Sequence, residues 1–120
     1  MSSIWTDFSL PPYPVLNGDT KTDVLIIGGG MAGILCAHAL KEAGVHCIVA
    51  EADRIGAGVT AGTTAKVTAQ HGLVYRKMTE RFGSEITEQY LNANRQAVTG
   101  LRHLCTGSDC DWKDQDNFIY

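Results

Sequence analysis

The chain has 120 residues, of which 44% are hydrophobic and 19% charged, and its formal net charge is −3. This composition is typical of one modest globular domain, and the negative charge disfavours nucleic acid as a partner. No apolar run approaches the roughly 20 residues of a membrane span, and the N-terminus does not resemble a signal peptide. The sequence therefore predicts a cytoplasmic protein with no membrane span, whose four cysteines are reduced.

The first part of the chain is expected to be an irregular arm. Pro11, Pro12 and Pro14 break any regular element there. The arm is assigned to residues 1–22, and a regular fold is expected to begin at residue 23.

A strand–helix–strand unit is predicted after the arm. Residues 24–27 form an apolar run of buried-strand length, residues 31–43 have a helical pattern, and residues 45–51 form a second strand. Gly44 is the expected stop of the helix. These elements fit the size of a βαβ unit. The helix is expected to pack on the sheet through Gly33, Cys36, Ala37 and Leu40.

The region after the second strand has a different character. Residues 52–66 are rich in glycine, alanine and threonine and are predicted to be a loop. A helix is expected from 73 to 82, stopped by Gly83, with a second helix capped by Ser84. The last residues, 117–120, resemble the start of a strand. The apolar stripe of the second helix is predicted to be Ile86, Tyr90, Ala93, Ala97, Leu101 and Leu104.

The residues between the first strand and the helix fit the pattern G-x-G-x-x-G. Gly28 permits a tight turn, Gly30 leaves room for a pyrophosphate, and Gly33 allows the helix to pack closely on the sheet. Free N–H groups in the first helical turn would hold the phosphates. Glu51, at the end of the second strand, can accept hydrogen bonds from ribose hydroxyls and would repel the 2′-phosphate of NADP. The pattern predicts a dinucleotide site.

The long loop favours FAD over NAD as the dinucleotide. An NAD fold usually continues with an ordinary helix, whereas here a loop of small residues can follow an extended cofactor. Arg54 is a candidate partner for a phosphate or the adenosine. Thr60, Thr63 and Thr64 are candidate hydroxyl donors. An NAD-linked dehydrogenase domain, or a non-catalytic truncated dinucleotide-binding piece, remains an alternative.

The stretches "DVLIIGGGMAGILCAHAL" and "VAEADRIGAGVTAGTTAKVTAQHG" resemble a known family. They are similar to the N-terminal FAD-binding region of the D-amino-acid oxidase/glycine oxidase superfamily. Bacterial FAD-dependent oxidoreductases, many with a C-terminal Rieske iron–sulfur domain, are the most similar subgroup. The resemblance implies an α/β, Rossmann-type domain with three layers and a parallel sheet, incomplete in this chain. Residues 23–109 would form the FAD-binding region, and residues 110–120 the start of a substrate domain.

The resemblance also implies a function. A small-molecule amine or amino-acid substrate would pass a hydride to flavin, with the chain alone inactive. Catalytic residues are not assigned, and no metal ligands are expected. Lys66 occupies the position of the histidine that links flavin covalently in dimethylglycine and sarcosine dehydrogenases, so non-covalent FAD is expected. By position, Gly28, Gly30, Met31, Ala32 and Gly33 would hold the pyrophosphate, Glu51 the adenosine ribose, Arg54 and Thr60 the adenosine and diphosphate, and Thr63, Thr64, Ala65 and Lys66 the segment passing the flavin ring.

Overall fold

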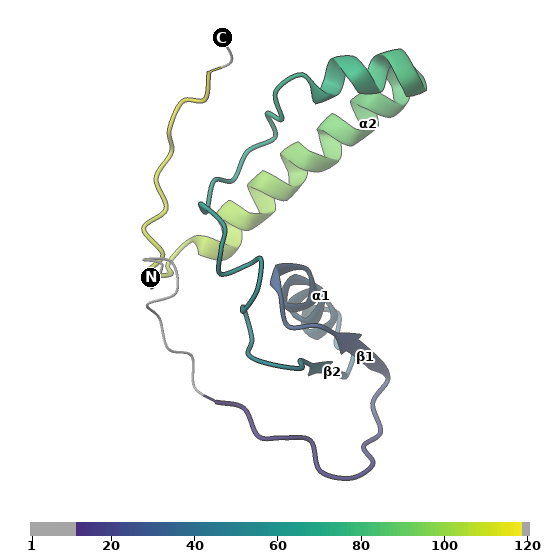
Figure 1. Cartoon of the computed structure of the whole chain (residues 1–120), viewed down its shortest axis with the longest axis vertical. Coiled ribbons are helices and arrows are strands. Elements are labelled where there is room, and N and C mark those ends of the chain that lie inside the picture. Colours follow the sequence, from purple (N-terminus) through teal and green to yellow (C-terminus); the bar gives the residue numbers. More distant parts are fainter. Residues whose placement is uncertain (1–11, 119–120) are drawn as a thin grey trace. The chain divides into compact units, whose positions relative to one another are not determined.

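A computed structural model describes residues 12–118 of the chain (Figure 1). The chain divides between Ala65 and Lys66 into two compact units. The first contains strand β1 (Val24–Ile27), helix α1 (Met31–Glu42) and strand β2 (Cys47–Ala50), and the second contains helix α2 (Val74–Cys105). Residues 12–22 form neither helix nor strand, while residues 1–11 of the expected arm lie outside the described part.

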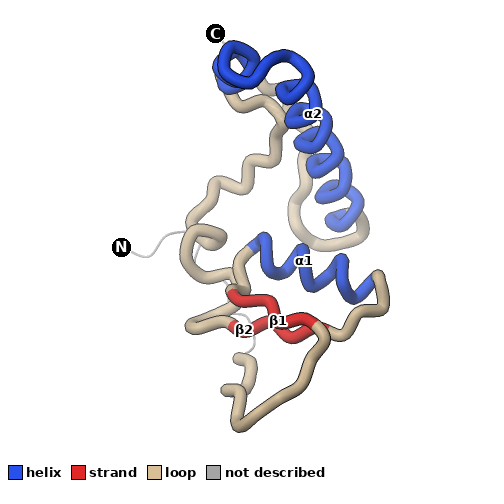
Figure 2. Tube along the Cα trace, turned by 90° about the vertical axis from the view of Figure 1, so that its right-hand side faces the viewer, coloured by secondary structure: helices blue, strands red, loops and turns tan. Residues whose placement is uncertain are grey.

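The first unit is a parallel βαβ unit. β1 and β2 pair in parallel, with Val24 opposite Cys47 and Ile27 opposite Ala50. Helix α1 contacts both strands and runs along the sheet (Figure 2). Two adjacent parallel strands joined by a helical crossover confirm the α/β, Rossmann-type prediction for this part of the chain. Within residues 12–65, α1 is the single helical layer and the sheet has two strands.

The two faces of β1 have different surroundings. Ile26 is buried, with 9% of its surface exposed, and its Cγ2 atom lies 3.3 Å from where a Cβ on Gly33 of α1 would be. Leu25 and Ile27, which point to the opposite face, are 55% and 85% exposed. The packed face of the sheet is therefore the face under α1, and close approach of the helix depends on Gly33.

The prediction that Cys36 faces the sheet is wrong. Gly33, Ala37 and Leu40 are half-buried as expected, but Cys36 is exposed. On a helix, Cys36 lies roughly 60–100° around the axis from Gly33 and Ala37, so it falls at the flank of the contact stripe. His38 is exposed as well.

The second unit is dominated by α2, which is two helical parts joined at Gly83. Gly83 has φ +84° and ψ 168°, a backbone conformation that is almost exclusive to glycine. The two parts lie side by side near this break, because Thr79 Oγ1 donates to Thr87 Oγ1 at 3.2 Å and the Tyr75 and Tyr90 rings are 6.0 Å apart. The predicted arrangement of helix, Gly83 and helix is confirmed.

Most residues of the predicted apolar stripe of α2 are exposed. Leu101 is half-buried, but the other five members are exposed among the described residues. Thr87 is the buried residue of this helix, because its hydroxyl donates to Gly83 O at 2.8 Å and accepts from Thr79. The packed side instead follows Thr87, Leu91, Asn94, Val98, Leu101 and Cys105. The break at Gly83 therefore determines which side of α2 is packed, and the positions of the apolar residues do not determine it alone.

The predicted C-terminal strand is not seen in the described residues. Asn117 and Phe118 form no strand, and Ile119 and Tyr120 lie outside the described part.

Candidate cofactor-binding site

The chain leaves β1 through a turn that requires glycine. Gly28 has φ +101°, and its N–H donates to Ala50 O of β2 at 2.8 Å. A Cβ on Gly33 would lie 2.0 Å from Gly28 O and 3.1 Å from Gly28 C. The first turn of α1 therefore lies directly against the end of β1, as the glycine pattern predicts.

The N-terminus of α1 offers backbone donors. Gly30 is the N-cap residue, and the Met31 N–H donates to Thr60 Oγ1 at 3.1 Å. Within residues 12–118, the N–H groups of Ala32 and Gly33 have no hydrogen-bond acceptor. The first turn contains no acidic residue. Free donors and the positive end of the helix dipole together suit an anion such as a phosphate.

Thr60 lies beside this helix end although it is 29 residues from Met31 in sequence. A Cβ on Gly30 would lie 3.3 Å from Thr60 Oγ1. The loop after β2 thus returns to the glycine turn, and the structure brings Thr60 together with Gly30 and Met31.

Glu51 is fixed by backbone donors on both carboxylate oxygens. Gly29 N–H donates to Oε2 at 2.6 Å, and Asp53 N–H donates to Oε1 at 3.0 Å. These hydrogen bonds, that from Gly29 above all, lower the pKa of Glu51 below its ordinary value of 4.5. Glu51 is therefore a carboxylate at neutral pH, held at the edge of the glycine turn.

Two glycines of this site were missed by sequence reasoning. Gly29 is the first x of the G-x-G-x-x-G pattern, a position that the pattern leaves open to any residue. In the structure it is buried, and a Cβ there would lie 2.4 Å from Ile55 Cδ1. Gly56 N–H donates to Gly29 O at 2.8 Å. The run of three glycines was the available signal for Gly29, while no local pattern points to Ile55 or Gly56.

The other predicted residues of the loop are not drawn into the glycine turn. Arg54 is exposed and faces Asp53 at 4.0 Å. Thr63 Oγ1 accepts from Ala65 N–H at 3.1 Å, and Ala65 has φ +54°, so these residues form a local turn. Thr64 is exposed.

Lys66 begins the second unit, where its Nζ donates to Asn117 Oδ1 at 3.0 Å. Asn117 Nδ2 in turn donates to Thr68 Oγ1 at 3.3 Å. The Lys66 amine is therefore engaged by the segment after α2.

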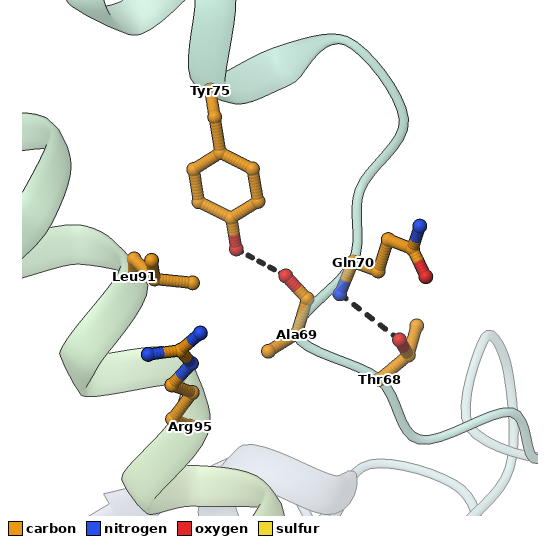
Figure 3. Close-up of a pocket in the computed structure, with 6 residues that line it drawn as sticks. All are labelled: Thr68, Ala69, Gln70, Tyr75, Leu91 and Arg95. Atoms are coloured by element: carbon orange, nitrogen blue, oxygen red, sulfur yellow. Dashed lines mark hydrogen bonds between the residues drawn. The ribbon is translucent and has the colours of Figure 1, made fainter. Parts of the chain in front are cut away.

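A shallow pocket of about 400 Å³ in the second unit lies between residues 68–70 and α2 (Figure 3). The Tyr75 hydroxyl donates to Ala69 O, and Gln70 N–H donates to Thr68 Oγ1 at 2.9 Å. Leu91 and Arg95 close its other side. None of the predicted cofactor residues lines this pocket.

Comparison with known protein families shows which family the chain belongs to. The family model described as FAD dependent oxidoreductase, DAO, matches residues 23–120. The chain belongs to this family. The match covers the whole βαβ unit, the glycine turn and the second unit.

Two curated relatives are similar to this FAD dependent oxidoreductase chain. A Bacillus subtilis (strain 168) protein named "Putative Rieske 2Fe-2S iron-sulfur protein YhfW" is 39% identical over 117 residues, which is 96% of this chain and 23% of the relative. Gamma-glutamylputrescine oxidoreductase of Escherichia coli (strain K12) is 43% identical over 49 residues, which is 41% of this chain and 12% of that protein. The chain thus spans less than a quarter of the length of either relative. No solved structure matches it significantly.

None of the helices between residues 12 and 118 is both long and apolar enough to cross a membrane. No group of three or more His, Cys, Asp and Glu side chains suited to a metal ion occurs in that same part of the chain.

Proposed function

We propose that the chain is the N-terminal FAD-binding portion of a flavoprotein that oxidises an amine or amino acid by hydride transfer to flavin. Membership of an FAD-dependent oxidoreductase family supports the cofactor and the reaction class. The name of the Escherichia coli relative, an oxidoreductase of gamma-glutamylputrescine, supports an amine as substrate. The family also favours FAD over the NAD-linked alternative.

One observation carries the assignment of the dinucleotide site. The end of β1, the start of α1 and the end of β2 meet at one point, where Gly29 N–H donates to Glu51 at 2.6 Å. A carboxylate and a set of free helix N–H groups therefore lie next to each other, which is the pairing that a ribose joined to a pyrophosphate requires.

The residues present fit FAD at this point. Gly30 has φ −76°, a backbone conformation that any residue can adopt. A glycine at this position therefore serves to leave space beside the backbone, and not to relieve backbone strain. The N–H groups of residues 30–33 would hold the pyrophosphate, and Thr60 Oγ1 already marks where an acceptor reaches the Met31 N–H. Glu51 would accept from the ribose hydroxyls through the lone pairs that its two backbone donors leave free.

The rest of the loop would follow the cofactor toward its flavin end. In this proposal Arg54 lies along the adenosine and diphosphate, and residues 63–66 pass the flavin ring. Bound flavin supplies the hydride acceptor, while residues of this chain bind and orient it. Attachment is non-covalent in this proposal, because Lys66 takes the place of the histidine that links flavin, and a lysine ammonium group has no free electron pair for attack.

Flavin content and reactivity of the purified full-length protein test this proposal. We expect stoichiometric FAD, and we expect the absorbance of oxidised flavin to fall on anaerobic mixing with one member of a panel of amines and amino acids. Glu51→Ala should weaken FAD binding at least tenfold. Asp53→Ala, which leaves the Asp53 N–H in place, is the matched control and should bind FAD normally. Bound NAD, or an unchanged dissociation constant for Glu51→Ala, would contradict the assignment.

A Rieske domain is a further part of the proposal. The name of the Bacillus subtilis relative supports it, since that protein aligns with nearly all of this chain. We infer that residues 23–109 form the FAD-binding region and that residues 110–120 lead into a substrate domain, in a cytoplasmic protein. Measuring iron and acid-labile sulfide in the full-length protein tests the Rieske domain, and their absence would contradict this part of the proposal.

A further inference from the structure

The chain turns back on itself directly after α2. Ser108 N–H donates to Cys105 O at 3.0 Å, and Cys110 N–H donates to Ser108 O at 3.0 Å. Gly107 has φ +82°, a left-handed conformation that glycine adopts without strain. These contacts form a compact turn with a cysteine at each end.

The turn brings the two thiols together. The Cys110 thiol donates to Cys105 O at 3.9 Å, so it lies against the residue that carries the second thiol. Burial above all, and then the neighbouring Cys110 side chain, raise the pKa of the Cys105 thiol. Cys105 is half-buried while Cys110 is exposed, so an oxidant in solution reaches Cys110 first.

The remaining cysteines have different surroundings. Cys36 is exposed on α1, and Cys47 on β2 has its thiol 4.0 Å from Ala37 O. Neither has another cysteine as a hydrogen-bond partner among residues 12–118. The pair at the end of α2 is thus the cysteine pair that the described fold itself assembles.

We propose that Cys105 and Cys110 form a site of reversible oxidation, closing to an intramolecular disulfide when the protein meets a peroxide. The Cys110 thiolate attacks one peroxide oxygen, forming a sulfenic acid and releasing hydroxide. The Cys105 thiol then attacks the Cys110 sulfur, the S–S bond forms, and water leaves. Two electrons pass from the thiol pair to the peroxide, and a dithiol reductant reverses the change.

Only a small movement is needed for this bond. Cysteines joined by a disulfide have Cβ atoms about 3.5–4.5 Å apart, and Cys110 Sγ already lies 3.9 Å from the carbonyl oxygen of Cys105. The turn lies at the surface and contains Gly107, which can absorb the adjustment.

A single tryptic peptide decides the matter. Cleavage after Arg102 and Lys113 releases residues 103–113, which contain both cysteines. The full-length protein is treated with hydrogen peroxide, blocked with iodoacetamide without reduction, and digested. We expect this peptide unalkylated and about 2 Da lighter than its dithiol form, since the disulfide has lost two hydrogens. Dithiothreitol before blocking should restore two alkylations.

Variants distinguish this bond from nonspecific oxidation. Cys36→Ser should leave the lighter peptide unchanged. Cys105→Ser should abolish it and leave Cys110 as a sulfenic acid that dimedone traps. Two carbamidomethyl groups on wild-type peptide 103–113 after peroxide, or a disulfide from Cys110 to Cys36 or Cys47, would overturn the proposal.

Discussion

Replacing Gly33 by alanine should separate α1 from the end of β1. The new Cβ would lie 2.0 Å from Gly28 O, whereas non-bonded heavy atoms prefer separations of roughly 3.5 Å. The helix must therefore retreat by about 1–1.5 Å, and overpacking of this kind costs about 1–3 kcal/mol. We expect the upper part of that range, because the colliding atom is a backbone carbonyl that cannot rotate away like a side chain.

Native-state hydrogen exchange measures this effect locally. The Ile34 N–H donates to Gly30 O at 3.0 Å at the start of α1, so its exchange reports opening of this end of the helix. A loss of about 3 kcal/mol would speed exchange by roughly 100-fold. The experiment uses the FAD-free full-length protein, so that cofactor binding does not contribute to the protection.

Gly100→Ala is the matched control for this substitution. Gly100 lies inside α2, and a Cβ there meets nothing within 4 Å. Alanine should therefore stabilise α2 by about 0.5–1 kcal/mol, because glycine loses more backbone entropy in a helix. Unchanged exchange at Ile34 in Gly33→Ala, with the control behaving as stated, would refute the close contact on which this reasoning depends.

Three further predictions concern the candidate cofactor-binding site. Gly30→Val should reduce FAD affinity at least tenfold, because a side chain there takes the space of the pyrophosphate. The extended backbone accepts valine, and the Thr60 side chain, 3.3 Å from the new Cβ, has only to rotate aside, so the melting temperature should change little; normal FAD content would contradict this. Because the pKa of Glu51 is lowered when folded, its stabilising effect should be complete above about pH 4.5 and be lost as the pH falls through the folded pKa. Urea unfolding against pH should therefore show a smaller acid loss for Glu51→Gln than for wild type, and parallel curves would argue against it. Acid precipitation of the flavoprotein should leave flavin in the supernatant; yellow protein in the pellet would mean a covalent link.

The βαβ unit could be predicted from the sequence because its signals are local. The apolar run before Gly28, the glycine pattern and the acid at position 51 each act within a few residues, and the structure has the elements where these signals indicate. The sequence predicted that Thr60 and the start of α1 bind the same cofactor, but it did not predict a contact between them. The actual partner of Thr60, the Met31 N–H, follows from the path of the loop.

What could not be predicted depends on contacts between distant segments. Gly56 and Ile55 carry no pattern, and their role arises because the loop folds back over Gly29. The packed side of α2 depends on the break at Gly83, where the Thr87 hydroxyl donates to Gly83 O. A stripe drawn from apolar residues alone has no means of including a buried threonine.

The two backbone donors on Glu51 have a consequence for ligand affinity. A free glutamate side chain samples many rotamers, and a ligand that binds it must remove that freedom. Here Gly29 and Asp53 have already fixed the carboxylate during folding. A ribose arriving at this carboxylate would therefore meet a preorganised acceptor and lose less conformational entropy on binding. Part of the affinity of such a site is thus set by the fold before any ligand arrives.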